Sequence, residues 1–480
     1  MATIQFQKKF NELLESTKEA GLVTGVFHSI ATVEGLPGAH LDEVVYFENG
    51  GVGQIFSLEP EKVEILILRS MDIIVGSRVA RTGKILSISI DESILGKTVG
   101  PLDIAPMDNI SSPIYPINSA PMGLVGRKPV EKFFETGVSM VDLIVPLGKG
   151  QRELVIGDRK TGKTEFLMQT VMSHAHSGGI CIYAIIGQKH IDILKRAEFF
   201  KSKGIDDKCV IVATNSQDFP GLIFLTPFTA MTVAEYFRDK GMDVLLILDD
   251  MTSHARYYRE VSLLARRFPA KESYPGDIFY AQARIVERAG NFEKGSITCI
   301  PVAESVSGDL SGYIQTNLMS MTDGHLYFDS ELYNKGRRPS VNPLLSVTRV
   351  GHQTQTPLMR DTGSTLSSFL VKYEKMKQYS HFGAEAGEIV KDVLVIGSKL
   401  DSFFNQVEYR IVPINVDLLI VAFLWANIVD DIDMEGIFEK YEAQASYKKS
   451  VDDLILNSNS FERLVRLVKE NPNLCLSKTK

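Results

Sequence analysis

The sequence predicts a multidomain protein with a small β domain, a central α/β domain and a helical C-terminal region. Three observations carry this prediction. The first is a series of short apolar runs separated by turn residues, and the second is a long alternation of buried-looking strands with helical stretches. The third is a tail in which apolar residues recur at helical spacing. The length of 480 residues suits about three domains of ordinary size.

The composition is that of a globular protein. Hydrophobic residues make up 44% of the chain and charged residues 23%, which excludes the disordered, collagen-like and disulfide-scaffold classes. A net charge of -7 argues against nucleic acid as the main partner, because such a surface needs a basic footprint. The four cysteines form no short-spaced pair, so the sequence indicates neither a zinc site nor a disulfide framework and suits a reducing compartment.

The apolar segments are too short to cross a membrane. Residues 1–18 lack the continuous apolar stretch of a secretory signal. The longest apolar run, Leu418–Ala426, is far shorter than the roughly 20 residues that span a bilayer. We therefore expect a cytoplasmic protein that associates with a membrane only through partners.

The N-terminal part is expected to contain a helix in residues 1–20 and a β domain in residues 21–87. Five runs rich in Val, Ile and Phe are separated by turn residues, which favours a small barrel or sandwich. These runs are Val23–Val33, Glu43–Phe47, Val52–Leu58, Val63–Leu68 and Lys84–Ile90.

The central part, residues 88–357, is predicted to be an α/β domain with a mainly parallel sheet, because buried-looking strands alternate with helical stretches. The strands are expected at Glu153–Ile156, Ile180–Ile186, Cys209–Thr214, Val244–Leu248 and Ile297–Val302. Residues 358–480 are predicted to form a helical bundle. Its helix-period stretches are residues 367–379, 384–406, 416–432 and 461–468.

A phosphate-binding loop follows the first strand of the central domain. Between a strand and a helical stretch, the context that this motif requires, the chain matches G-x-x-x-x-G-K-[ST]. The matching residues are Gly157, Asp158, Arg159, Lys160, Thr161, Gly162, Lys163 and Thr164. Backbone amides and the N-terminus of the following helix would bind phosphate. We expect Lys163 to reach the β- and γ-phosphates and Thr164 to ligate Mg²⁺, so the predicted ligands are ATP or ADP with Mg²⁺.

A second acidic element supports nucleotide binding. The continuous apolar strand Val244–Leu248 ends in Asp249-Asp250, and a carboxylate at such a strand end holds Mg²⁺ or its waters. Asp249 is the better candidate because it lies nearest the strand end. We expect it to act through a water molecule.

Several longer stretches resemble the catalytic head of F-type ATP synthases. They are Gly157–Thr164, Asp249–Tyr280, Tyr313–Asn317 with Thr322–Gly324, Gly336–Pro339 and Leu345–Gly351. The resemblance covers nearly the whole chain and is strongest between residues 150 and 355. It implies an N-terminal β-barrel, a central RecA-like α/β phosphate-loop domain and a C-terminal α-helical bundle.

The synthase head alternates non-catalytic alpha and catalytic beta subunits, and this chain resembles the alpha type. Gln188 stands where catalytic subunits have a glutamate that polarises the attacking water, and a neutral amide cannot act as a general base. Arg349 resembles the alpha-subunit arginine that reaches into the neighbouring catalytic site, where such a finger is worth about 10³–10⁵ in rate. The acidic motif of beta subunits is missing after Phe382-Gly383. The resemblance therefore implies an alpha-type subunit of a divergent F-type-like rotary ATPase.

The resemblance also implies base-contacting residues and partners. Arg338, Pro339 and Gln406 match positions that line the adenine pocket, whereas Glu408 replaces a usual second glutamine. The implied partners are a catalytic beta-type subunit in an alternating hexamer, a gamma-like central stalk subunit, and a membrane rotor or specialised motor components. Nucleic acid is not among them. These partners would place the chain at the inner face of the cell membrane.

Two other functions stay open from the sequence. The chain could be a catalytic rotary or secretion-type ATPase subunit, whose general base would be another carboxylate such as Glu304. It could also be a hexameric RNA-dependent ATPase of the transcription-terminator type, which shares the core fold. The acidic balance and the lack of an evident aromatic–basic groove speak against RNA. A non-catalytic role for this chain is the favoured interpretation.

Overall fold

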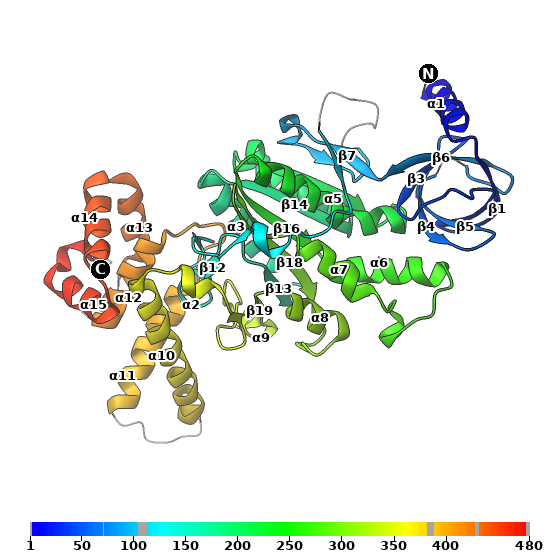
Figure 1. The fold of residues 1–480 in the computed structure, drawn as a ribbon. Coiled ribbons are helices and arrows are strands. Elements are labelled where there is room, and N and C mark those ends of the chain that lie inside the picture. The colour runs from blue at the N-terminus through cyan, green and yellow to red at the C-terminus, as the bar shows by residue number, and fades with distance from the viewer. Residues whose placement is uncertain (1, 71, 104–112, 382–387, 428–431, 477–480) are drawn as a thin grey trace. The chain divides into compact units, whose positions relative to one another are not determined.

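The computed structural model describes residues 2–70, 72–103, 113–381, 388–427 and 432–476. The chain forms two compact units. Unit 1 comprises Met1–Arg127, Ile180–Ala303 and Ser311–Met321, and unit 2 comprises Lys128–Gly179, Glu304–Leu310 and Thr322–Lys480. Figure 1 labels many of the helices and strands of both units. The Phe382-Gly383 pair lies outside the described residues.

Six strands of unit 1 close into a barrel (Figure 1). They are β1 (Ala20–Phe27), β2 (Ile30–Glu34), β3 (Glu43–Phe47), β4 (Val52–Leu58), β5 (Val63–Arg69) and β6 (Arg78–Ile85), and helix α1 (Ala2–Thr17) precedes them. All neighbouring strands are antiparallel, in the order β1-β2-β5-β4-β3-β6. The barrel is filled by buried aliphatic side chains such as Val23, Ile55 and Ile65. Closure leaves no unpaired sheet edge.

The rest of unit 1 is built on a parallel sheet. Its strands, in spatial order, are β8 (Thr98–Val99), β15 (Cys209–Asn215), β14 (Ile180–Gln188), β16 (Asp243–Asp249) and β18 (Ser296–Glu304). The antiparallel strand β17 (Gly290–Phe292) pairs with β18. The helices of this part are α4 (His190–Ser202), α5 (Pro220–Asp239), α6 (Met251–Leu264), α7 (Ile278–Val286) and α8 (Tyr313–Met321). The central strands read as continuous apolar runs because both faces of a parallel sheet are covered.

Shorter elements of unit 1 join these parts. They are β7 (Ser87–Ser89), which pairs with β9 (Ile114–Pro116), and the 3-10 turns η1 (Glu92–Ile94), η2 (Leu124–Gly126), η3 (Asp206–Lys208) and η4 (Lys271–Ser273). The short strand β10 (Arg127–Lys128) lies where unit 1 gives way to unit 2.

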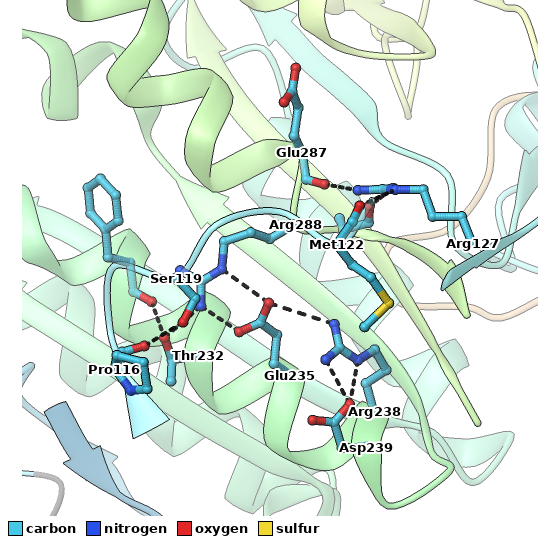
Figure 2. A network of polar contacts seen from close by, with 12 residues as sticks. Pro116, Ser119, Met122, Arg127, Thr232, Glu235, Arg238, Asp239, Glu287 and Arg288 are labelled. Atoms are coloured by element: carbon cyan, nitrogen blue, oxygen red, sulfur yellow. Dashed lines mark hydrogen bonds and ion pairs between the residues drawn. The ribbon is translucent and has the colours of Figure 1, made fainter. Parts of the chain in front are cut away.

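A buried arginine network ties the segment after β9 to the α/β part of unit 1 (Figure 2). The Arg288 side chain is fully buried, and its Nη2 atom lies 2.5 Å from Glu235 on α5. Its Nη1 atom donates a hydrogen bond of 2.8 Å to the Ile117 carbonyl. Because a buried charge is tolerated only when it is paired, this network fixes three distant segments as one structure.

The β strands of unit 2 carry the phosphate-binding loop. β13 (Glu153–Gly157) pairs in parallel with β19 (Gly324–Phe328), and β20 (Val347–Thr348) pairs antiparallel with β19. Strand β20 is only two residues long. The side-chain oxygen of Asn342 accepts the Leu344 amide and turns the chain just before β20. The remaining short elements are β11 (Phe133–Phe134), β12 (Leu147–Gly148), η5 (Gly351–Thr354) and η6 (Pro472–Leu474).

The C-terminal part of unit 2 is a helical bundle (Figure 1). The helices of unit 2 are α2 (Ser139–Ile144), α3 (Lys163–His176), α9 (Ser330–Asn334), α10 (Pro357–His381), α11 (Glu388–Phe403), α12 (Ile414–Ala426), α13 (Met434–Ala443), α14 (Ala445–Leu456) and α15 (Phe461–Glu470). Helix α12 contacts α2, α11, α13, α14 and α15, and a helix enclosed on all sides is apolar all round. This accounts for the run Leu418–Ala426. In the described part of the chain, no helix is long and apolar enough to span a membrane.

The predicted fold class is confirmed: a six-stranded barrel, a nucleotide-binding-type α/β part and a helical C-terminal region follow one another in the chain. The predicted domain limits after residues 20, 87 and 357 stay predictions.

Candidate nucleotide-binding site

The predicted phosphate-binding loop has the expected strand–loop–helix form in unit 2. β13 ends at Gly157 and α3 begins at Lys163. A side chain at Gly157 would collide with the Phe328 carbonyl, and Gly162 has a φ of 86°, which favours glycine. Both glycines are therefore needed for the path of the backbone. The loop brings amide groups and a helix N-terminus to one place, which suits an anionic phosphate.

Side chains around the loop hold its shape. One carboxylate oxygen of Asp158 accepts hydrogen bonds from the Ser305 hydroxyl at 2.6 Å and from the Gly308 amide at 3.0 Å. The Thr161 hydroxyl donates to the Asp158 carbonyl at 2.7 Å. Lys160 is exposed and contributes through its backbone, with a φ of 60°. Asp158, Lys160 and Thr161 thus shape the loop.

Lys163 and Thr164 are the motif residues with polar side chains suited to a ligand. The Lys163 ammonium donates to the Gly157 carbonyl at 2.7 Å and to the Asp158 carbonyl at 2.5 Å, so it lies against the loop. Thr164 is exposed on the first turn of α3. An ammonium and a hydroxyl at this position suit a phosphate chain and a phosphate-bound cation, respectively.

An aromatic ring that the sequence analysis missed lies beside the loop. The Arg338 guanidinium lies 3.5 Å from the centre of the Tyr333 ring, and a Cβ added to Gly162 would lie 3.6 Å from the same ring. Tyr333 therefore lies between the loop and the Arg338-Pro339 pair, whose peptide bond is cis. The only sequence signal was an aromatic residue five positions before Arg338.

Gln406 lies beside this segment and is already bonded to the backbone. Its amide nitrogen donates to the Gly137 carbonyl at 2.8 Å and the Arg410 carbonyl at 2.9 Å, and its oxygen accepts the Ser139 amide at 3.0 Å. The Gln406 backbone amide also donates to the Arg338 carbonyl at 2.7 Å. The structure thus brings together Gln406 and Arg338, and a direct contact of Gln406 with a base stays a prediction. Glu408 is exposed.

Arg159 and Glu304 form a two-bonded ion pair. The Arg159 Nε and Nη2 atoms lie 2.8 and 2.9 Å from the two carboxylate oxygens of Glu304. Both residues belong to unit 2, where Glu304 is the last residue of β18. A carboxylate bound in this way is stabilised in its charged form and positioned by the guanidinium, which makes it a poor candidate for the free general base considered above.

Arg349 follows β20 in unit 2. Its backbone amide donates to the Asp323 carbonyl at 2.9 Å, and Asp323 is in turn held by Arg152 at 2.7 Å. The Arg349 side chain is exposed, and within the described residues it makes no hydrogen bond or ion pair. Its backbone is therefore fixed while its side chain is exposed.

Gln188 and Asp249 lie together in unit 1, at the carboxyl ends of the neighbouring parallel strands β14 and β16. The Gln188 amide donates to the Asp249 carbonyl at 3.1 Å. One carboxylate oxygen of Asp249 accepts from the Tyr183 hydroxyl at 2.9 Å and from Arg196 at 3.1 Å. Asp250 instead caps helix α6 by accepting the Ser253 amide. The sequence therefore located the strand end correctly but missed Tyr183 and Arg196.

The two predicted magnesium ligands differ in how well they suit the ion. The Thr164 hydroxyl is exposed at the start of α3 and fits. The Asp249 carboxylate fits poorly, because a guanidinium and a phenol already bind one of its oxygens. Mg²⁺ prefers negatively charged oxygen ligands, and the negative charge of Asp249 is partly neutralised by the Arg196 guanidinium.

Comparison with known proteins places the chain in a family. Residues 137–348 match the model of the ATP synthase alpha/beta family, nucleotide-binding domain, and residues 355–460 match the ATP synthase alpha/beta chain, C terminal domain. The chain is 35% identical to the ATP synthase subunit alpha of Aquifex aeolicus, over 92% of this chain and 91% of that protein. It is 36% identical to the ATP synthase subunit alpha of Clostridium acetobutylicum, over 89% and 88%. Identity to the ATP synthase subunit alpha 1 of Dinoroseobacter shibae is 37%, over 86% and 83%.

These relatives match nearly the full length of the chain, and the two family models cover both the phosphate-binding loop and the C-terminal helices. The resemblance to F-type ATP synthases is thereby confirmed. The chain belongs to the ATP synthase alpha/beta family, and its relatives are named as alpha subunits.

Proposed function

We propose that this chain is a non-catalytic, nucleotide-binding alpha-type subunit of an F-type-like ATPase hexamer. The observation that carries the proposal is Gln188 at the end of β14, where a catalytic subunit of the family would have a glutamate. Its neutral amide is bonded to the Asp249 carbonyl and cannot take a proton from water. The other carboxylate considered as a base, Glu304, is paired with Arg159.

The nucleotide would be ATP or ADP, bound through the loop Gly157–Thr164. The Lys163 ammonium would exchange its bonds to loop carbonyls for bonds to phosphate oxygens, which are stronger because both partners are charged. Tyr333, Arg338 and Pro339 would support the base. Mg²⁺ would be held by the Thr164 hydroxyl and the phosphates.

Arg349 would act on the active site of the adjacent catalytic subunit. Its exposed guanidinium and fixed backbone suit a group that reaches out of its own chain. An arginine placed at a transferring phosphoryl group stabilises the charge of the transition state. The catalytic step would thus take place on the partner, with this chain supplying one cation.

The relatives are named as subunits of an ATP synthase, which suggests the partners. We propose a catalytic beta-type subunit that alternates with this chain in a hexamer, a gamma-like central stalk, and a membrane rotor or a specialised motor in its place. The chain would then lie at the inner face of the cell membrane, held there by its partners. The family favours this assembly over an RNA-dependent ring.

Nucleotide binding without turnover tests the non-catalytic assignment. The purified chain should bind ATP in equilibrium titrations and hydrolyse it negligibly. Lys163→Ala should weaken binding strongly, because it removes a charged phosphate contact. Lys160→Ala should not, because that side chain is exposed and only its backbone shapes the loop. Rapid hydrolysis by the purified chain would exclude a non-catalytic role.

Arg349→Ala tests the arginine finger in the assembled complex. The change should lower ATP hydrolysis by about 10³-fold or more, the size expected for loss of a finger, whereas Lys163→Ala should have a milder effect. ATP binding by the purified Arg349→Ala chain should stay unchanged. Full activity of the Arg349→Ala complex would show that the finger assignment is wrong.

A further inference from the structure

The segment that carries Arg349 is tied by hydrogen bonds to two other strands of unit 2. The Arg349 amide donates to the Asp323 carbonyl at 2.9 Å, and Gly324 pairs with Thr348 where β19 meets β20. Asp323 directly precedes β19, and Arg152 directly precedes β13. All of these residues belong to unit 2, so their contacts are defined within one compact unit.

Arg152 binds both oxygens of the Asp323 carboxylate. Its Nη2 atom lies 2.7 Å from Oδ1, and its Nε atom and backbone amide lie 3.0 and 2.9 Å from Oδ2. The Asp323 amide in turn donates to the Arg152 carbonyl at 2.7 Å. The two side chains are only 25% and 19% exposed, and a two-bonded pair of this kind fixes orientation better than an exposed ion pair does. Asp323 therefore presents a firmly held carbonyl to Arg349.

The backbone is also fixed on either side of Arg349. The Thr348 hydroxyl donates to the Pro146 carbonyl at 3.0 Å and accepts hydrogen bonds from the Gln151 side chain at 3.1 Å and the Gly351 amide at 3.0 Å. A side chain at Gly351 would collide with the Pro146 carbonyl. The short segment around Arg349 is consequently held against the rest of unit 2, and its exposed side chain extends from a fixed point.

The charges near Arg349 are arranged so that no carboxylate of this surrounding competes for its guanidinium. Burial raises the pKa of Glu153 well above its usual value, although the bond from Gln151 and the charge of Arg349 lower it, so the neutral form of Glu153 is favoured. The Asp323 carboxylate already has Arg152 as its partner. Without Arg152, a free carboxylate would stand on the residue whose backbone holds Arg349 and would attract the guanidinium into its own chain.

We propose that Arg152 is a positioning residue for Arg349. By binding both oxygens of Asp323, it fixes the backbone from which Arg349 extends and keeps that carboxylate from pairing with the guanidinium. The proposal rests on the proposed role of Arg349 as an arginine finger. Arg152 lies before the start of β13, whereas the phosphate-binding loop follows the end of that strand, so nucleotide binding by this chain should not depend on it.

Steady-state ATP hydrolysis by the assembled complex tests the proposal. Arg152→Met should lower kcat about tenfold or more, because a displacement of about 1 Å in a group that acts on the reaction can cost about 10²-fold. KM should change by less than about twofold, because a finger stabilises the transition state and contributes little to substrate binding. ATP binding by the purified Arg152→Met chain should match that of the wild type.

Two double variants separate positioning from a general loss of structure. In the Arg349→Ala background, Arg152→Met should lower kcat by less than about twofold further, because residues that act as one unit are not additive. A structural defect would instead lower kcat by the same factor in both backgrounds. Adding Asp323→Asn to Arg152→Met removes the competing carboxylate and should restore part of the lost kcat. If kcat is not restored, the carboxylate does not compete for Arg349, and that part of the proposal is wrong.

Arg466→Met is the matched control. Arg466 also pairs with a carboxylate, that of Glu462, but both side chains are exposed on α15, so kcat should equal that of the wild type. Arg152→Lys keeps one charged contact without the two-bonded geometry, so its kcat should lie between those of the wild type and Arg152→Met. If Arg152→Met does not assemble, the Lys variant decides, with and without Arg349→Ala.

The remaining outcomes distinguish the proposal from the function on which it rests. Full activity of the Arg152→Met complex beside an inactive Arg349→Ala complex would overturn the positioning role and leave the finger intact. An equal loss from Arg152→Met in both backgrounds would do the same. Full activity of the Arg349→Ala complex would overturn the finger itself, and the positioning role with it.

Discussion

Asp249 and Asp250 show how two adjacent carboxylates acquire different roles. Asp249 is the last residue of β16, and its buried carboxylate faces Tyr183 and Arg196. Burial, and then the negative charge of Asp249, raise the pKa of the Tyr183 phenol, so the phenol stays a neutral donor. Asp250 has an extended backbone and satisfies a free amide at the start of α6. The two neighbouring residues thus differ in role. Asp249 places a carboxylate at the carboxyl end of β16, whereas Asp250 caps helix α6.

Tyr333 is expected to matter for nucleotide affinity through its ring. Tyr333→Ala should raise the dissociation constant for ATP about thirtyfold, because it removes an aromatic face beside the loop and the cation–π partner of Arg338, each worth about 1 kcal/mol. Tyr333→Phe keeps the ring and should bind nearly as well as the wild type. Titration with ATP measures both variants. Equal losses in the two variants would instead assign the effect to the hydroxyl.

The sequence could predict the phosphate-binding loop, but it could predict neither Tyr333 beside that loop nor Arg196 beside Asp249. The eight motif residues are contiguous, so their spacing alone specifies the backbone path. Arg196 lies 53 positions from Asp249 and occurs in a helix whose other charged residues are mostly exposed. Its burial depends on packing between α4 and the sheet, which no local pattern encodes. Tyr333 was missed because its position beside Gly162 and Arg338 also depends on tertiary packing.

At the scale of elements, helices α2 and α12 meet around buried carboxyl groups. The Ser139 hydroxyl donates to one oxygen of Asp417 at 2.7 Å, and the other oxygen of Asp417 is buried without a partner. Burial raises the pKa of Asp417 well above its usual value. The hydrogen bond from Ser139 lowers this pKa, whereas the nearby Asp142 and Glu135 raise it further. Burial raises the pKa of Asp142 to about 8, although Thr136 and Gly137 donate to it. These helices therefore pack best when the carboxyl groups are protonated.

The stability of the chain should fall as pH rises from about 5 to about 8. The unfolded chain loses these carboxyl protons near pH 4, whereas the folded chain keeps them to higher pH. A raised folded-state pKa means that the stabilisation is complete below the unfolded pKa and is lost as pH passes the folded pKa. Asp417→Asn should flatten this dependence by up to about 1.4 kcal/mol per pH unit. Denaturant unfolding at several pH values measures the slope.

Asp392→Asn is the matched control for this prediction. Asp392 is exposed on α11, so the same chemical change there should leave the slope of stability against pH unaltered. A slope that is the same in wild type and Asp417→Asn would show that Asp417 is not protonated in the folded chain.

Most elements could be predicted from their apolar patterns, and the exceptions have physical causes. The predicted run Val23–Val33 is two strands, β1 and β2, because His28 turns the chain with a φ of 55°. Helices α13 and α14 were missed because only a few of their residues are buried, Ile437 and Tyr441 in α13 and Val451 in α14 among them. A narrow apolar stripe gives a weak periodic signal.

At the scale of the whole molecule, unit 2 joins segments that are far apart in the sequence. The C-terminal helices pack on residues 128–179, which the sequence analysis assigned to the central domain. Ile414 donates its amide to the Glu135 carboxylate at 2.7 Å, and Gln406 and Asp417 both bond to Ser139. The core of the helical part therefore includes residues that precede it by more than two hundred positions. The barrel, in contrast, has a continuous sequence and its own core.

This difference predicts that the two terminal parts behave differently as fragments. A fragment of residues 1–87 contains all six barrel strands and their buried core, so it should unfold cooperatively on heating. A fragment of residues 358–480 lacks α2, so the buried side of α12 and the carboxylate of Asp417 would lose their partners. It should keep helical circular dichroism but lose a sharp transition and the near-ultraviolet signal of fixed packing. Cooperative unfolding of residues 358–480 alone would show that the predicted limit after residue 357 is also a folding boundary, and that α2 is dispensable for the helical core.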